Sequence, residues 1–144
     1  MDRRDWNLLV IAAGRQPLSP VQLQKALFLL GQELTPQQRG SADFYKFRPY
    51  DYGPFASEIY RDAEALQTES LVKIELQPGR RLRSYEASEI GRRRAKELRS
   101  QLDDVARSYL DKVVNWVQSV PFDSLVGAIY KAYPKMAANS IFQK

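Results

Sequence analysis

Residues Val72 to Ala87, VKIELQPGRRLRSYEA, contain two short runs of strand-forming residues on either side of a turn. The apolar residues at positions 72, 74 and 76 alternate with polar ones, which is the period of a half-buried strand. Pro78 and Gly79 are typical of a tight turn, and Arg81 to Ala87 is expected to form the return strand. The stretch therefore predicts one β-hairpin.

Three helices are expected before this hairpin. The first runs from Arg3 to Ala13, and the second begins at Pro20, where Ser19 can cap the helix and Gln22 can complete a capping box. The third is expected to open at Pro54. Apolar side chains recur at helical spacing along the second and third helices, at Leu23, Leu27, Leu30 and Leu34, and at Phe55, Ile59, Ala63 and Leu66.

A fourth helix is expected after the hairpin, capped by Ser88. Its apolar stripe continues for ~30 residues to about Gln118, which would make a helix of ~45 Å unless it breaks near Ser100. An unbroken helix would project from a small domain and offer a surface for a homodimer. A last helix, capped by Asp123, is expected to stop at Pro134.

The order helix, helix, helix, strand, turn, strand, helix is typical of a winged helix. We therefore expect a mainly α, winged-helix-like domain with one β-hairpin wing and C-terminal helices. Residues 1–144 are expected to form a single domain. Its core would span about 3–99, followed by helices over about 100–134 and a short tail, 135–144.

The composition narrows the function. The chain has 144 residues, 44% of them hydrophobic, and it contains neither cysteine nor histidine. Disulfides, the usual zinc sites and Ser-His-Asp or Cys-His catalysis are therefore excluded. With no glycine-rich phosphate loop and no paired acids beside a lysine, we expect no enzyme activity, metal or cofactor. No signal peptide or bilayer-length apolar run is present, so a cytoplasmic protein without membrane contact is expected.

Positive charge is concentrated between Arg80 and Arg99. This span holds eight basic and three acidic residues, a balance of +5 that equals the net charge of the whole chain. Such a patch favours duplex DNA or another nucleic acid, while a solvated surface and an acidic protein partner remain alternatives. The candidate nucleic-acid-binding residues are Arg80, Arg81 and Arg83 in the wing, and Arg92, Arg93 and Arg94 in the following helix.

The third helix is less suited to DNA. Its expected outward face includes Glu58, Asp62 and Glu64, and these acids would repel phosphates. Either the wing makes most of the nucleic-acid contact, or this helix faces a protein.

Residues 44–55 are unusually aromatic, with six aromatic side chains among twelve residues. Two prolines and a glycine argue against a regular helix or a central strand, so we expect an ordered, largely extended segment. Its rings are expected to pack in a core or interface, and stacking on exposed bases is the alternative.

Three segments resemble the Panacea-type antitoxin domains and the related YwgA-like bacterial proteins. They are LQKALFLL at 23–30, FRPYDYGPFASEIY at 47–60 with its Tyr-Gly-Pro signature, and AIYKAYP at 128–134. Nothing specific to that family stands in residues 80–99. The resemblance implies a helical domain, often encoded near toxin–antitoxin or phage-defence genes, that neutralises or adapts a protein and has no catalytic residues. The candidate motif or partner-binding residues are Tyr50, Tyr52, Gly53, Pro54, Ser57, Glu58 and Arg61.

Two hypotheses follow from the sequence. The leading one is a non-enzymatic bacterial binding protein, a regulator or defence-associated protein, that contacts nucleic acid through an arginine-rich wing. The alternative is an antitoxin or adaptor that binds and neutralises a partner protein encoded nearby.

Overall fold

The computed structural model describes residues 1–76 and 83–140. The chain is mainly helical and carries a β-hairpin, which confirms the predicted fold class. Its elements are α1 (Arg3–Ala13), α2 (Pro20–Glu33), α3 (Pro36–Arg39), β1 (Arg48–Tyr50), β2 (Gly53–Phe55), α4 (Glu58–Thr68), β3 (Val72–Leu76), β4 (Arg83–Ala87), α5 (Glu89–Ser100), α6 (Asp104–Ser119), α7 (Phe122–Ala132) and the 3₁₀ helix η1 (Pro134–Ala137).

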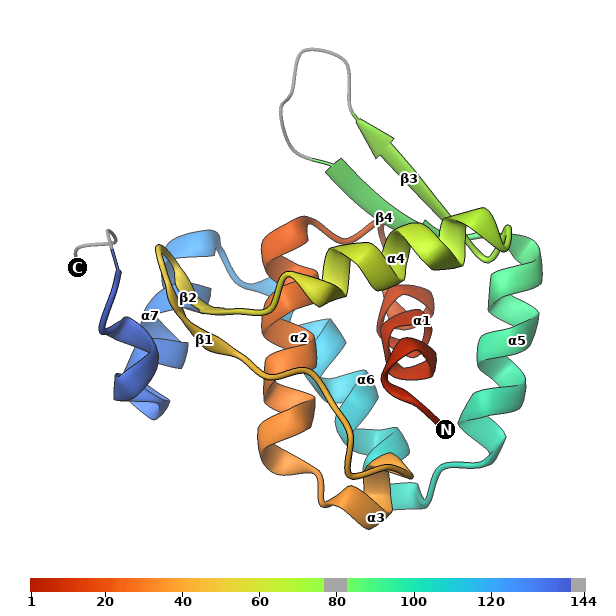
Figure 1. The fold of residues 1–144 in the computed structure, drawn as a ribbon, viewed down its shortest axis with the longest axis horizontal. Coiled ribbons are helices and arrows are strands. Elements are labelled where there is room, and N and C mark those ends of the chain that lie inside the picture. Colours follow the sequence, from red (N-terminus) through yellow and green to blue (C-terminus); the bar gives the residue numbers. More distant parts are fainter. Residues whose placement is uncertain (77–82, 141–144) are drawn as a thin grey trace.

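The helices α1, α2 and α4 surround a shared core, and the β3–β4 hairpin stands beside α4 (Figure 1). Leu18, between α1 and α2, adds a third short extended segment to the hairpin. Its N–H donates to the carbonyl of Tyr85 and its own carbonyl accepts from the Tyr85 N–H, both at 2.9 Å. This pairing ties the first inter-helix loop to the wing and completes the winged-helix arrangement.

Local capping explains where the early helices begin. The predicted capping box between Ser19 and Gln22 is present at the start of α2. A second capping box, between Thr35 and Gln38, begins the one-turn helix α3. The sequence analysis did not predict this helix, because four residues carry too little periodicity to indicate one.

The third helix does not open at Pro54. Gly53–Phe55 is instead a strand that pairs with Arg48–Tyr50, and α4 begins at Glu58. The side-chain amide of Gln24 explains the delay, because it donates to the Ala56 carbonyl at 2.9 Å and accepts from the Ala56 N–H at 3.0 Å. Gln24 thus bonds both backbone polar groups of Ala56 before α4 begins.

Two helices carry the apolar stripe that follows the hairpin, so the break near Ser100 that the sequence left open is present. The first part, α5, ends at Ser100, and α6 begins at Asp104 under the Asp103 side chain, which accepts from the N–H of Ala106 at 2.7 Å. Because α6 folds back against α1 and α2, residues 89–118 do not form the projecting helix on which the expectation of a homodimer rested. Asp123 does not cap the last helix, because Pro121 holds the cap position and Asp123 lies in the first turn.

Asp62 is buried, contrary to its expected place on the outer face of α4. Its carboxylate accepts from the hydroxyl of Tyr45 at 2.6 Å and from Nε of Arg3 at 3.0 Å. Tyr45 in turn accepts from the side-chain amide of Asn7 at 3.0 Å. This network fixes α4 and the aromatic segment on α1, while the predicted apolar positions Ile59, Ala63 and Leu66 are buried beside it.

Candidate functional site

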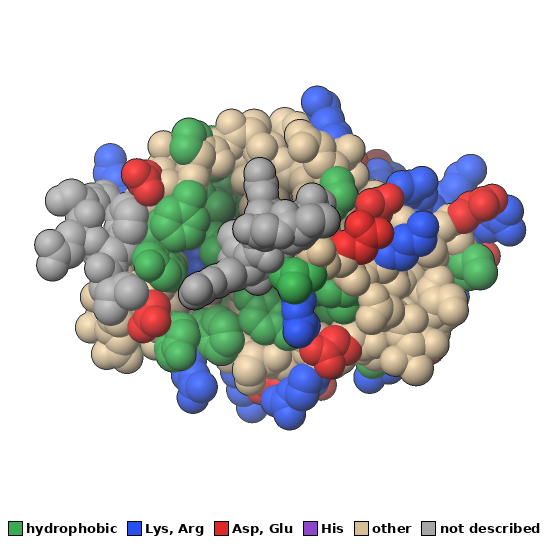
Figure 2. Space-filling model, turned by 90° about the horizontal axis from the view of Figure 1, so that it is seen from above, with side chains coloured by type: hydrophobic (Ala, Val, Ile, Leu, Met, Phe, Trp, Pro, Cys, Tyr) green, Lys and Arg blue, Asp and Glu red, His purple; other side chains and the backbone are tan. Residues whose placement is uncertain are grey.

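The β1–β2 hairpin and its surroundings carry two groups of contacting aromatic rings, which together we call the aromatic face: Tyr50, Phe55 and Tyr60, and Tyr52 and Phe122. Tyr50 stacks on Phe55 with a centroid distance of 4.8 Å, Phe55 meets Tyr60 at 6.0 Å, and Tyr52 meets Phe122 at 5.2 Å. Tyr50, Tyr52 and Phe122 are 48%, 40% and 41% exposed. Figure 2 shows hydrophobic side chains gathered on this side of the molecule.

The hairpin holds the aromatic face against two helices. Figure 1 shows β1 and β2 between α2 and α7, so that rings from three parts of the chain meet there. A two-residue connection, Asp51-Tyr52, turns the chain, and Gly53 follows with a φ of +105°. A side chain at Gly53 would be strained, and its Cβ would also lie 3.1 Å from a ring carbon of Tyr130.

A pocket of about 170 Å³ opens within the aromatic face. Most of its wall is apolar, and Lys25 and Asp51 are the charged residues among those that line it. The lining residues are Val21, Gln24, Lys25, Tyr50, Asp51, Tyr52, Gly53, Pro54, Phe55 and Tyr60. The pocket is large enough for one amino-acid side chain or a small molecule.

Lys25 is almost completely buried at this pocket, with 4% of its surface exposed. Its Nζ donates to the carbonyl oxygen of Pro54 at 3.2 Å. Burial lowers the pKa of the Lys25 ammonium from its ordinary 10.5 to about 8, because the charged form loses its hydration. The sequence analysis missed Lys25. The available signal was a lysine inside the apolar stretch LQKALFLL, where a buried face would otherwise be uncharged.

The motif residues divide into two groups. Tyr50, Tyr52, Gly53 and Pro54 line the pocket together. The other three, Ser57, Glu58 and Arg61, lie at the start of α4 and do not line it. The Ser57 hydroxyl donates to the neighbouring Glu58 carboxylate at 3.3 Å in an exposed position.

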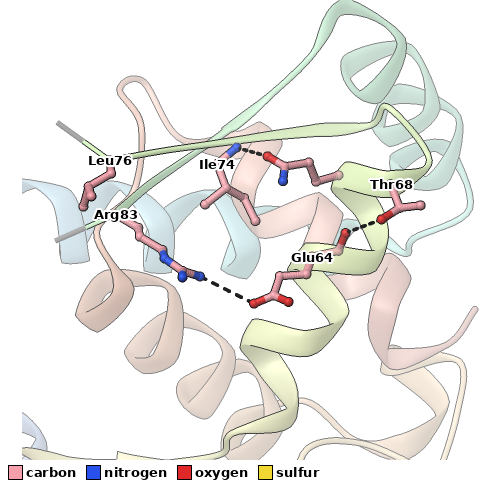
Figure 3. A pocket seen from close by; sticks show the side chains of 6 residues that line it. Glu64, Thr68, Ile74, Leu76 and Arg83 are labelled. Carbon is pink, nitrogen blue, oxygen red and sulfur yellow. Dashed lines mark hydrogen bonds and ion pairs between the residues drawn. The ribbon is translucent and has the colours of Figure 1, made fainter. Parts of the chain in front are cut away.

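Arg83 of the predicted wing cluster faces α4. Its guanidinium lies 3.5 Å from the carboxylate of Glu64, across an open groove between α4 and the hairpin (Figure 3). The same groove is bordered by Gln67, whose side-chain oxygen accepts from the N–H of Ile74 at 2.7 Å. Arg80 and Arg81 lie outside the described residues.

The arginines of α5 do not join Arg83 in one patch. Arg92 lies 3.7 Å from Glu86, and in a strand Glu86 points away from the face that carries Arg83 and Tyr85. Arg92, Arg93 and Arg94 also point in three directions, since successive helical residues are rotated by ~100°.

Each described arginine of the cluster has an acidic neighbour. Arg93 pairs with Glu89 at 2.7 Å and Arg94 with Glu97 at 3.5 Å, besides the Arg83 and Arg92 pairs above. All four pairs are exposed and contribute little to stability. Three of the four acids, Glu86, Glu89 and Glu97, are already counted in the balance of +5, so Glu64 is the additional acid that these pairs place beside the cluster.

Within residues 1–76 and 83–140, no group of three or more His, Cys, Asp or Glu side chains could hold a metal ion. Over the same part of the chain, no helix combines the length and apolar character needed to cross a membrane.

Neither the protein-family models nor the curated proteins compared with this chain match it. The resemblance to the Panacea-type and YwgA-like families therefore stays a prediction that rests on the three quoted segments.

Proposed function

We propose that this chain is a non-enzymatic binding protein whose aromatic face binds a partner protein, in the manner of an antitoxin or adaptor. The observation that carries the proposal is the exposure of Tyr50, Tyr52 and Phe122 around a pocket. Exposed apolar patches of this kind mark interaction sites, and Tyr and Phe are enriched in protein interfaces.

The charge around the aromatic face favours a protein over a nucleic acid. Aromatic platforms that bind single strands stack the bases beside a positively charged groove for the backbone. Here the charged lining residues of the pocket are the buried Lys25 and the acidic Asp51. One buried cation beside one acidic residue does not make a positively charged groove for phosphates in this lining. A mixed apolar and polar surface of this kind suits a protein partner.

Two exposed rings of the aromatic face can be removed to test whether this face binds a partner protein. The protein encoded by the neighbouring gene is the partner to test, by isothermal titration calorimetry. Replacing Tyr52 and Phe122 together by alanine should weaken its binding at least ~10-fold, because truncating one aromatic hot-spot residue costs about 2 kcal/mol or more. Tyr52 lines the pocket, and the ring of Phe122 contacts it from outside the lining.

The matched control replaces two exposed apolar residues outside the aromatic face. Ile90 and Val105 are 56% and 62% exposed, on α5 and at the start of α6. Their double alanine variant should bind as the natural chain does. Equal losses in both variants, or no loss in the Tyr52 and Phe122 variant, would count against the proposal.

Nucleic-acid binding through the wing is the second candidate. The observation that favours it is the position of α4 beside the hairpin, which is how winged helices meet duplex DNA. Against it stand Glu64 and Glu58 on α4 and the acidic partner of each described cluster arginine.

The arginines of the wing and those of α5 should contribute differently to the binding of DNA. If the wing binds duplex DNA, the affinity for DNA should fall as the salt concentration rises. Replacing Arg80, Arg81 and Arg83 by alanine should then reduce the slope of log K against log salt concentration by up to ~3. Replacing Arg92, Arg93 and Arg94 should change the slope less, because they are not gathered on the face of Arg83. Fluorescence anisotropy with a duplex at several salt concentrations measures both. No binding at low salt, or salt-independent binding, removes this candidate.

A further inference from the structure

Lys25 has hydrogen-bonding capacity that the described part of the fold leaves unused. An ammonium group carries three N–H donors, and one of them is bonded, to the carbonyl of Pro54. Among the described residues, no carboxylate lies within 4.0 Å of Nζ, although the side chain is 96% removed from solvent contact. A buried cation without a counter-ion is costly, and proteins seldom keep one without a reason.

The pocket brings this ammonium together with apolar walls. Val21 and the rings of Tyr50, Phe55 and Tyr60 form walls, and Lys25 contributes the single cation among the described lining residues. The backbone of Gly53 lies beside the ammonium, since a Cβ there would lie 3.6 Å from Nζ of Lys25, at van der Waals contact. The pocket therefore presents one positive donor group inside an aromatic surface.

We propose that this pocket binds the C-terminal residue of the partner protein, with the terminal carboxylate hydrogen-bonded to Lys25 and an apolar side chain packed among the aromatic rings. The inference rests on the proposed function and specifies the chemistry of its partner. It identifies Lys25 as a binding residue and the aromatic rings as the specificity determinants.

The chemistry of the site favours a terminal carboxylate over other anions. A phosphate group carries nearly two charges and needs several donors, whereas the pocket supplies one ammonium and places the acidic Asp51 in its lining. An Asp or Glu side chain supplies a carboxylate on a short stem and leaves the aromatic walls unfilled. A C-terminal Leu or Phe carries the carboxylate and the apolar side chain on the same carbon.

The test uses small probes and the full chain. N-acetyl-L-leucine, with a free carboxylate, is compared with N-acetyl-L-leucinamide and with N-acetyl-L-glutamic acid α-amide, whose carboxylate is on the side chain. Binding is followed by NMR at the Lys25 side-chain CH₂ next to Nζ. We expect N-acetyl-L-leucine to bind with a Kd on the order of 1 mM, and each of the other two at least ~10-fold more weakly.

Two variants make the test specific. Lys25→Met keeps the length and apolar stem of the side chain and should abolish the preference for the acid over the amide. Lys112→Met removes an exposed lysine of α6 and should leave that preference unchanged. Thermal unfolding of both variants checks that they are folded.

Each remaining outcome overturns the proposal. Equal binding of acid and amide would show that Lys25 does not recognise the carboxylate, and stronger binding of the glutamic acid α-amide would assign the pocket to an internal acidic side chain. Absence of binding by all probes at tens of millimolar would remove the ligand site altogether. If Lys25→Met binds the neighbouring gene product normally while the Tyr52 and Phe122 variant does not, this inference fails and the proposed function stands.

Discussion

Replacing Gly91 by alanine should destabilise the protein by about 3 kcal/mol or more, at the upper end of what overpacking costs. Gly91 lies in the first turn of α5, and a Cβ built there would lie 1.9 Å from the carbonyl oxygen of Leu71. That oxygen accepts from the N–H of Ser88 at 3.0 Å, so it is fixed just before the wing begins. The conflict is between a side chain and backbone, and no rotamer change relieves it. Urea unfolding followed by circular dichroism measures the loss.

Gly31→Ala is the matched control for this prediction. Gly31 also lies in a helix, but an added Cβ would meet ring carbons of Phe44 at 2.9 Å instead of backbone. The ring can tilt, and alanine recovers roughly 1 kcal/mol of helix propensity over glycine, so the net change should be small. If both variants unfolded at the same urea concentration, the close approach of α5 to Leu71 would not be a fixed feature of the fold.

The elements that the sequence predicted well are those whose signals are local. Ser19 and Gln22 cap α2 through residues three apart, and the alternation from Val72 to Leu76 needs no knowledge of the rest of the chain. The break after Ser100 was left open, because the apolar stripe continues across it. The side chain of Asp103 caps the start of α6 and thereby fixes where the second helix begins.

The features that the sequence missed depend on distant partners. The start of α4 is set by Gln24, 32 residues before Ala56. The burial of Asp62 depends on Tyr45 and Arg3, which lie on other elements. The spacing of apolar residues along one helix indicates which face of that helix is apolar. It cannot show that a carboxylate on the helix is buried and hydrogen-bonded to donors from other elements.

The candidate site was partly predictable. The Tyr-Gly-Pro block identified Tyr50, Tyr52, Gly53 and Pro54, which the structure brings together at one pocket. The arginine cluster was counted along the sequence, and counting ignores the alternation of strand side chains that separates Glu86 and Arg92 from Arg83. Lys25 was missed although its place in the apolar stretch LQKALFLL was a signal, because lysine side chains are almost never fully buried.

The stability of the natural chain should increase as the pH rises from about 8 to about 10. Burial lowers the pKa of Lys25 from 10.5 to about 8, so the unfolded state binds more protons than the folded state between these values. Stability therefore rises with pH through this window, and below pH 8 the cost of the buried charge is fully present. A shift of this size corresponds to at most about 3 kcal/mol.

Above pH 10, buried tyrosines should lower the stability of the folded state as the pH rises. Burial is the largest cause that raises the pKa of Tyr60, Tyr109 and Tyr133 to about 12, so in the folded state these hydroxyls keep their protons longer than in the unfolded chain. Their contribution is present below pH 10 and is lost as the pH rises from about 10 to 12. The two effects together place the maximum of stability near pH 10.

Lys25→Met should remove the rise between pH 8 and 10 and should leave the alkaline fall in place. At pH 7 this variant should be up to about 3 kcal/mol more stable than the natural chain, because it no longer buries a charge. Urea unfolding at a series of pH values, with Lys112→Met as the control, tests both points. Parallel pH profiles for the natural chain and Lys25→Met would show that Lys25 is solvated in the folded state. A stabilised Lys25→Met that no longer binds its carboxylate probe would show why the cation is kept, since its cost in the free protein is offset when a ligand supplies the missing charge.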